Sequence, residues 1–502
     1  MSEAQASNRL VVEGGDVVVS DGRDLGLMPG ATVVVDGDTI SHVGAPPSPQ
    51  PGERRVDASG LLVLPGMINL EVCTYLDTQG FATDYGHRNY FGPSGFNFAP
   101  RLDQLERERR YASDEDARQV AAYGLMQAVQ GGATTIVGAD YGDVHPDYAD
   151  MLVELAHALG VRAYLAPAYG AAIHYVTDRG GGDYHFDRAR ASAGLARGVA
   201  FAERVAAYRD AHPDADVHAM LFPYRADAMD EQLLLDTKAA AAEHGVRVRM
   251  HASQFLTEFY EQIRRTSETP IEYLARIGFL GEDVLIHHAI LTAEHSWIPK
   301  TDGRDVELLA ETGTAVGHCP TIFARRSVML ESFQRMIDAG VTIGLGTDTV
   351  PQDMLEVMRW TSFMCKVAER NVNTGRAPEV LKAATLHGAK ALGRPDLGRI
   401  APGAKGDLVL VDVDTLRAGP REDPLRNLTI AATSDDIRSV YVGGVERVRD
   451  GVVVGIDEAA VMRVVDRHFE TIREALITGT ARHRFPPSLP VWSTPDEGRR
   501  AD

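Results

Sequence analysis

The chain has 502 residues, of which 44% are apolar and 24% are charged, so it can bury a large core. Its 51 basic and 71 acidic residues give a formal net charge of −20, which argues against nucleic acid and anionic membranes as partners. Three cysteines, an odd number, argue against a disulfide framework and favour a reducing compartment. We expect a cytoplasmic protein, because we find no signal-peptide pattern and no apolar run of the ~20 residues that a membrane span needs.

The two ends of the chain share a strand-rich pattern. Short β-branched runs alternate with turn signals, of which Asp36-Gly37 is typical of a hairpin. These runs lie at residues 10–12, 16–19, 32–35, 406–411, 437–442 and 451–454. Segments 1–60 and 400–456 are therefore predicted to form one small β-sandwich built from both chain ends.

The segment between them, residues 61–399, alternates apolar runs with helix-length stretches, as parallel βα units do. Eight runs predict strands: Leu64–Cys73, Thr134–Tyr141, Arg162–Gly170, Val217–Arg225, Val246–Gln254, Val284–Ile290, Thr314–Pro320 and Val341–Thr349. Eight such units are the count of a closed (β/α)₈ (TIM) barrel of the α/β class, with an open doubly wound sheet as the alternative. The segment 457–502 is predicted to hold a C-terminal helix, from Asp457 to Leu476, and a tail.

Polar residues gather where the later strands end. Strand five ends at His251, strand six at His287 and His288, strand seven at His318 and strand eight at Asp348. The carboxyl ends of barrel strands meet at one mouth, and imidazole and carboxylate are common ligands of a catalytic zinc ion. One histidine alone is more often structural, but four such strand ends together favour a metal or catalytic site.

The order of these motifs resembles the amidohydrolase superfamily, and most closely its deaminase and chlorohydrolase branch. The motifs are Leu64-Pro65-Gly66-Met67-Ile68-Asn69, Gly131-Gly132-Ala133-Thr134-Thr135, Met250-His251-Ala252, His318-Cys319-Pro320-Thr321, Gly346-Thr347-Asp348 and Gly398 to Leu408. The resemblance implies a metal-dependent hydrolase on this barrel. It also implies that Asp348 approaches the metal and takes the proton from the attacking water, and that His287 is the histidine of strand six.

The strand-one ligands depart from that pattern. The resemblance implies a His-x-His pair, but this chain has Glu71-Val72-Cys73, whose alternation places Glu71 and Cys73 on the same side of the strand. A carboxylate and a thiolate can both bind zinc, so a rebuilt site of Glu71, Cys73, His251 and Asp348 is one interpretation. The other is that the pair only fills the space of two imidazoles.

A second departure concerns the proton shuttle. Many members of that branch carry glutamate three residues after the strand-five histidine, where this chain has Gln254, which exchanges no proton near neutral pH. Glu258, one turn further on, is a candidate substitute, although a solvated helix surface is its more ordinary role. His288 is expected to point away from the mouth and to be structural, because neighbouring residues of a regular strand face opposite sides.

Four further residues are candidates for substrate binding: His318, Tyr169 and His174 near strand ends, and Arg325, whose guanidinium suits a carboxylate. The aromatic-rich segment 75–98 is a candidate lid over the mouth, or only packing.

The leading hypothesis is a hydrolase that cleaves a C–N bond of a small, possibly cyclic substrate with an activated water. One divalent metal, with zinc expected, would assist Asp348 as general base and proton donor to the leaving group, and His287 would stabilise the developing oxyanion. His251 and Gln254 complete the candidate catalytic set. A metal-independent relative doing elimination, isomerisation or decarboxylation is the alternative, and a non-catalytic scaffold is the third. The resemblance and the C-terminal helix also predict a homodimer or a larger homo-oligomer.

Overall fold

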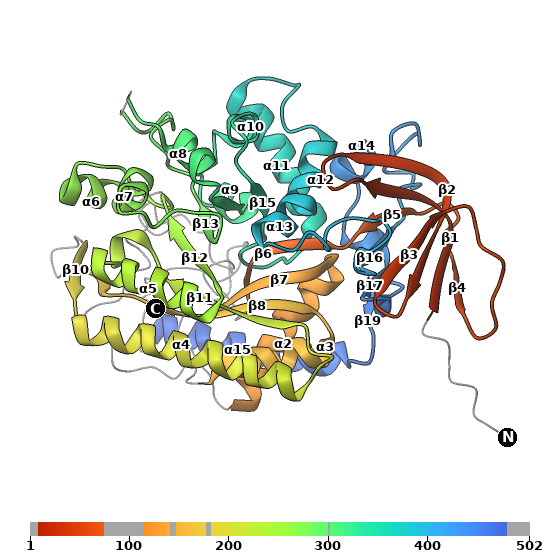
Figure 1. The fold of residues 1–502 in the computed structure, drawn as a ribbon, viewed down its shortest axis with the longest axis horizontal. Helices are drawn as coiled ribbons and strands as arrows, with labels where there is room; N and C mark the ends of the chain where they lie inside the picture. The colour runs from red at the N-terminus through yellow and green to blue at the C-terminus, as the bar shows by residue number, and fades with distance from the viewer. Residues whose placement is uncertain (1–8, 75–113, 141–146, 177–181, 300–301, 479–502) are drawn as a thin grey trace, which may run out of the picture.

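A computed structural model describes residues 9–74, 114–140, 147–176, 182–299 and 302–478 (Figure 1). Eight parallel strands follow one another around a barrel in chain order. They are β6 (Met67–Cys73), β7 (Ala133–Asp140), β8 (Arg162–Tyr169), β11 (Val217–Pro223), β12 (Arg247–Ala252), β13 (Val284–His288), β14 (Ala315–His318) and β15 (Ile343–Leu345). Each contains or overlaps one predicted strand, so the (β/α)₈ prediction is confirmed.

The barrel closes between its first and last strands at residues that carry functional groups. Val72 forms a parallel bridge with Asp348, the backbone N–H of Asp348 donates to the carbonyl of Glu71 at 2.8 Å, and that of Cys73 donates to the carbonyl of Asp348 at 2.6 Å. Asp348 has a left-handed backbone, with φ of 65°, which aspartate tolerates better than bulkier residues. Barrel closure therefore fixes where Glu71, Cys73 and Asp348 lie.

Helices connect the strands and cover the barrel. The larger ones are α2 (Asp114–Gln130), α3 (Tyr148–Leu159), α4 (Arg188–Ala211), α5 (Glu231–His244), α6 (Leu256–Thr266), α7 (Pro270–Arg276), α8 (Asp305–Thr312), α11 (Met354–Glu369) and α12 (Ala377–Ala384). Their ends follow ordinary capping rules: the Asp230 side chain accepts from the N–H of Leu233 at the start of α5, and Gly245 ends that helix with φ of 62°. No described helix is long and apolar enough to cross a membrane.

The predicted domain from both chain ends is a single hydrogen-bonded sheet of nine strands. Its members are β1 (Arg9–Ser20), β2 (Leu25–Asp36), β3 (Thr39–Gly44), β4 (Arg54–Asp57), β5 (Leu62–Pro65), β16 (Leu408–Val411), β17 (Ile437–Val442), β18 (Val445–Arg449) and β19 (Val452–Val453). Strand β5 lies between β1 and β16 and so joins the two ends, whose red and blue strands lie together in Figure 1. The residue boundaries given above for the domains stay predictions.

Two expectations about individual strands were wrong. The runs 10–12 and 16–19 form one strand, β1, with register shifts between Val12 and Val17. The predicted first barrel strand, Leu64–Cys73, is divided at Gly66, because Leu62–Pro65 belongs to the end sheet and the barrel begins at Met67. A side chain at Gly66 would collide with Thr134, so the crossing needs glycine.

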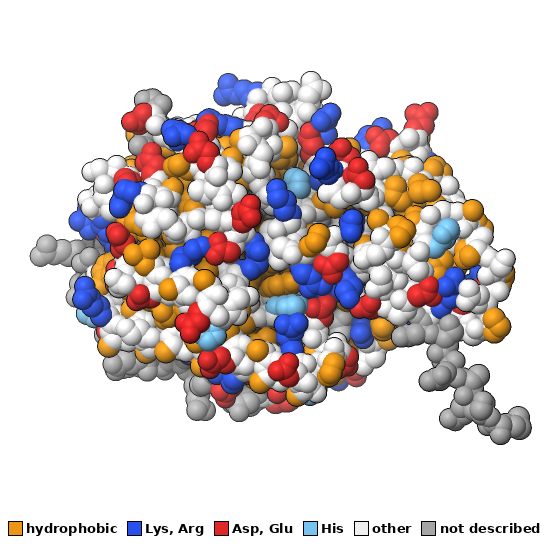
Figure 2. Space-filling model, viewed as in Figure 1, with side chains coloured by type: hydrophobic (Ala, Val, Ile, Leu, Met, Phe, Trp, Pro, Cys, Tyr) orange, Lys and Arg blue, Asp and Glu red, His pale blue; other side chains and the backbone are white. Residues whose placement is uncertain are grey.

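The C-terminal helix, α15 (Glu458–Thr478), packs against α2, where Arg467 pairs with Asp116 at 2.8 Å. Despite the net charge of −20, the face shown in Figure 2 intersperses basic and acidic side chains rather than separating them.

Candidate functional site

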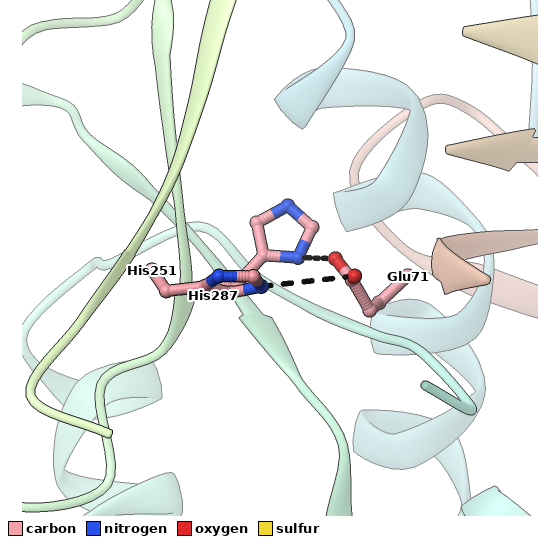
Figure 3. A group of neighbouring side chains, drawn as sticks. All are labelled: Glu71, His251 and His287. Carbon is pink, nitrogen blue, oxygen red and sulfur yellow. Dashed lines mark ion pairs between the residues drawn. The ribbon is translucent and has the colours of Figure 1, made fainter. Parts of the chain in front are cut away.

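Glu71, His251 and His287 meet inside the barrel (Figure 3). They come from β6, β12 and β13, and all three are buried. The Nδ1 of His287 pairs with Oε2 of Glu71, and Nε2 of His251 lies 3.7 Å from Oε1. Burial lowers the pKa of His251 and lowers that of His287 to about 3, so both imidazoles are neutral at neutral pH.

Arg249 is the residue of this cluster that the sequence analysis missed. It precedes His251 by two positions on β12, and its side chain is fully buried. Its guanidinium donates to Oε2 of Glu71, lies 3.4 Å from Nδ1 of His287, and sits 4.3 Å from the ring centroid of Phe222. Burial alone would raise the pKa of Glu71, but the Arg249 charge holds it well below its usual range. Glu71 is therefore an ionised carboxylate with a cationic partner.

A second cluster lies around Asp348. The thiol of Cys73 donates to Oδ1 of Asp348 at 3.3 Å. The ligand atoms of His288, Cys319 and Asp348 lie within 4.8 Å of one another, and so do those of Glu71, Cys73 and Asp348. Cys73, Cys319 and His288 are buried, whereas Asp348 is partly exposed. The cluster thus combines two thiols, an imidazole and a carboxylate that solvent can reach.

The expectation that His288 points away from the mouth was wrong. His288 and Ala289 have left-handed backbones, with φ of 76° and 45°, so the alternation of β13 stops at this point. The His288 ring stacks on His251, with centroids 4.9 Å apart and planes 13° apart. Burial holds the pKa of His288 well below its usual range, and its Nδ1 is buried without a hydrogen-bond partner among the described residues.

These residues fit a divalent metal by their chemistry. Imidazole, carboxylate and thiolate are the protein ligands of zinc, and a thiolate favours such borderline or soft metals over magnesium or calcium. Burial raises the pKa of the Cys319 thiol well above its usual range, and a coordinating cation offsets such a shift because it deprotonates a bound thiol. The buried, unpaired Nδ1 of His288 adds a polar atom that lacks a protein partner among the described residues.

Gln254 and Glu258 follow His251 along the chain, and the side-chain Oε1 of Gln254 is buried without a hydrogen-bond partner among the described residues. Glu258 is fully buried, so the expectation of a solvated helix surface was wrong. Its carboxylate accepts the backbone N–H groups of Ser253 and Gln254, both at 2.8 Å, and so caps the start of α6. Burial, reinforced by the charge of Asp227, raises the pKa of Glu258 above its usual range.

Three of the four residues predicted to bind substrate have described side chains, and each of the three contacts a different part of the structure. His318 is buried with its ring 5.9 Å from that of Phe333, and Tyr169 donates or accepts a hydrogen bond with Thr237 on α5 at 3.0 Å. Arg325 is exposed and donates to the carbonyl of Val350 at 3.1 Å, just after Asp348. His174 lies on β9 (Ala172–Val176), but its side chain and the candidate lid 75–98 lie outside the described residues.

Comparison with known proteins gives a family. A profile described as "Amidohydrolase family" matches residues 86–447. A 5-methylthioadenosine/S-adenosylhomocysteine deaminase of Halobacterium salinarum is 30% identical over 472 residues, which cover 91% of this chain and 96% of that protein. The corresponding protein of Natronomonas pharaonis is 28% identical and covers 87% and 93% of the two chains.

Solved structures share the fold. Atrazine chlorohydrolase from Arthrobacter aurescens TC1, complexed with zinc, superposes with a TM-score of 0.75 at 21% identity, over 92% of this chain and 100% of that one. An adenosine deaminase from Xanthomonas campestris with bound zinc gives a TM-score of 0.73 at 20% identity, over 93% and 98% of the two chains.

Proposed function

Because the chain belongs to the amidohydrolase family, and is a hydrolase of C–N bonds other than peptide bonds, we propose that it removes an amino group from a small heterocyclic substrate with an activated water. The observation that carries the proposal is the convergence on Asp348 of groups from β6, β13 and β14, at the carboxyl ends of the barrel strands. Active sites of such barrels lie at this end. The deaminase names of the relatives support an adenosine-like substrate.

The proposal includes one divalent metal, with zinc expected. The zinc-bound neighbours and the donor chemistry of the Asp348 cluster support it. Glu71 and Cys73 stand where the resemblance implies two histidines, so the candidate ligands are Glu71, Cys73, His251 and Asp348, together with His288 and Cys319. When bound, such an ion lowers the pKa of water and polarises the carbon that is attacked.

The residues of the chain handle the proton. Asp348 is the partly exposed carboxylate of the cluster, and backbone hydrogen bonds to Glu71 and Cys73 hold it at the barrel rim. It is the group placed to accept a proton from water and to pass it to the leaving amine. His287 turns Nδ1 toward Glu71, which favours the proton on that atom and leaves Nε2 as an acceptor. We therefore assign His287 to orienting Glu71 rather than to stabilising an oxyanion.

A metal-independent acid–base enzyme is the second candidate, and Arg249 is the observation that favours it. A guanidinium carries a permanent positive charge, and here it already neutralises Glu71 inside the barrel. In that version Asp348 and the neutral imidazoles act without an ion.

The test uses protein purified without chelators. Ammonia release is measured with 5'-deoxyadenosine, 5-methylthioadenosine and S-adenosylhomocysteine, and chloride release with atrazine. Each assay is repeated after chelation and after zinc is added back. We expect ammonia release that chelation abolishes and zinc restores. Turnover that survives complete metal removal supports the metal-independent candidate, and no release from any amino heterocycle contradicts the proposed function.

A further inference from the structure

We propose that the Arg249 guanidinium takes the place of a metal ion in the buried group shown in Figure 3, and that this group binds a divalent metal only when Arg249 is removed. The group consists of Glu71, His251 and His287, whose ligand atoms lie within 4.8 Å of one another, a spacing that a divalent ion can span. This placement goes beyond the proposed function, because it holds whether or not the reaction at Asp348 uses an ion. It concerns this group alone, and the two groups of possible ligands that include Asp348 are not part of it.

The guanidinium contacts the atoms that an ion in this group would need. Its terminal nitrogen Nη2 donates to Oε2 of Glu71 and lies 3.4 Å from Nδ1 of His287, and Nδ1 pairs with the same Oε2. Bonds from zinc to oxygen and nitrogen are about 2.0–2.2 Å long, so an ion bound to these two atoms would lie within about 5 Å of Nη2. All three side chains are fully buried, and like charges repel strongly in such a site. Arg249 and an ion therefore exclude each other here.

Hydrogen bonds already use the same two atoms. A carboxylate oxygen has two lone pairs, and Oε2 of Glu71 faces two donors, the Arg249 guanidinium and Nδ1 of His287. A ring nitrogen that donates to a carboxylate carries the proton, and so has no lone pair for a metal. Nε2 of His287 is buried with no hydrogen-bond partner among the described residues, so a proton moved there would be a buried donor without an acceptor. An ion would have to displace the arginine and also move this proton.

The surroundings hold the arginine in this place. Arg249 lies on β12 two residues before His251, so both side chains point to the same side of the strand. Its guanidinium lies 4.3 Å from the centroid of the Phe222 ring, a cation–π contact that suits a cation removed from water. The same ring meets His251 edge to face, with centroids 5.2 Å apart. A shift of the guanidinium to admit an ion would therefore break its contact with Phe222 as well as its pair with Glu71.

Removal of the arginine changes what the group needs. Without the guanidinium, a buried carboxylate and two imidazoles face one another, and the carboxylate has lost its cationic partner. A buried anion is costly unless a positive group compensates it, and carboxylate and imidazole together suit zinc. Methionine is apolar and long enough to fill part of the space, but it brings no charge. We therefore expect Arg249→Met to turn the group into a zinc site.

The first experiment counts zinc in full-length variants. Each protein is stripped of metal, incubated with excess zinc, freed of unbound ion and analysed by elemental mass spectrometry, with circular dichroism to confirm folding. We expect Arg249→Met to hold one zinc ion per chain more than the wild type. Arg249→Lys is the matched control, because lysine keeps the positive charge, and it should hold the wild-type number. Adding His287→Asn to Arg249→Met should remove the extra ion, because His287 belongs to this group and to neither group that includes Asp348.

The second experiment needs no variant. Crystals of the wild-type protein grown with excess zinc are measured on both sides of the zinc absorption edge, so that a bound ion appears in the anomalous difference map. We expect no zinc peak among Glu71, His251 and His287, and the Arg249 guanidinium in contact with Glu71. Crystals of Arg249→Met should show a peak about 2.0–2.2 Å from the ligand atoms of the group.

The outcomes separate this placement from the proposed function. A zinc peak among the three residues of the wild type overturns the placement, and so does a folded Arg249→Met variant that gains no zinc. If Arg249→Met does not fold, the wild-type map decides alone. Neither readout depends on turnover. If the wild type releases ammonia but holds zinc in this group, the proposed function stands and the placement of Arg249 fails. If no amino heterocycle is turned over and Arg249→Met still gains its ion, the placement stands and the proposed function fails.

Discussion

Cys73 and Asp348 are joined twice, by the 3.3 Å contact from the thiol to Oδ1 and by the 2.6 Å hydrogen bond from the Cys73 N–H to the Asp348 carbonyl. The same two residues thus close the barrel and form the corner where the candidate ligands meet. We therefore expect that substitutions which change side-chain charge at this corner alter catalysis while the backbone hydrogen bond that closes the barrel stays in place.

Asp348→Asn should lower kcat/KM at least 100-fold, because it removes the proton acceptor, and general acid–base groups contribute roughly 10²–10⁴-fold. The thermal midpoint should change little, because asparagine also tolerates the left-handed backbone that Asp348 adopts. Asp450→Asn is the control: Asp450 has φ of 49° and is exposed in the end sheet, away from the barrel mouth. Retention of a tenth of the activity in Asp348→Asn would show that another group takes the proton.

Glu71→Gln and Arg249→Met should each destabilise the protein by about 3–5 kcal/mol, because each leaves a buried charge without its partner. The double variant should recover most of that loss, since removing both charges of a buried pair is often nearly neutral. Urea unfolding measures both effects. The exposed pair Arg204–Asp150 is the control, where Asp150→Asn should cost less than about 1 kcal/mol. Additive losses in the double variant would show that the two charges do not act as a pair.

Because of Asp305, the free energy of unfolding should fall as the pH rises from about 4 to 7. Burial raises its pKa to about 7, so the folded state keeps a proton that the unfolded chain has already lost above its ordinary pKa of 3.8. The stabilisation that protonated Asp305 contributes to the folded state is therefore fully present below pH 4 and is lost by pH 7. Asp305→Asn should flatten this decline by up to about 4 kcal/mol between these pH values. Urea unfolding at a series of pH values measures it, with exposed Asp210→Asn as control; an unchanged slope would contradict the shift.

The sequence predicted the barrel well because buried parallel strands are continuous apolar runs, and all eight were located. The sequence also predicted that Glu71 and Cys73 lie near Asp348. Alternation along β6 directs both side chains to one side, and closure of the barrel brings β6 next to the end of the last strand. Arg249 could have been found by the same reasoning, since it precedes His251 by two residues and so shares its side of β12.

Other parts of the site depend on features that no periodicity reveals. The orientation of His288 follows from a left-handed φ at the end of β13, where strand alternation fails. The burial of Glu258 follows from its backbone partners at the start of α6, and Tyr169 turns toward Thr237 because the helices pack on that side of β8. Each outcome is set by tertiary packing around a strand end.

The homo-oligomer remains a prediction, now with less support from the C-terminal helix. Because α15 packs against α2 of its own chain, part of its surface is already used. We expect a dimer or larger assembly at micromolar concentration, with resemblance to the family as the main reason. Light scattering measures the mass directly, and a value near the 54.5 kDa of one chain would contradict the predicted homo-oligomer.

The joint between the first and last barrel strands also sets the order in which the molecule can assemble. Cys73 pairs with Asp348, which lies 275 positions later in the chain, and β5 pairs with β16, which begins at Leu408. Such long-range pairings give a high contact order, which slows folding because the loop must close before the contact stabilises it. While the chain is still being synthesised and has not reached residue 348, it lacks Asp348 and cannot form the Asp348 corner. The Asp348 corner can therefore form only after at least 348 of the 502 residues have been made.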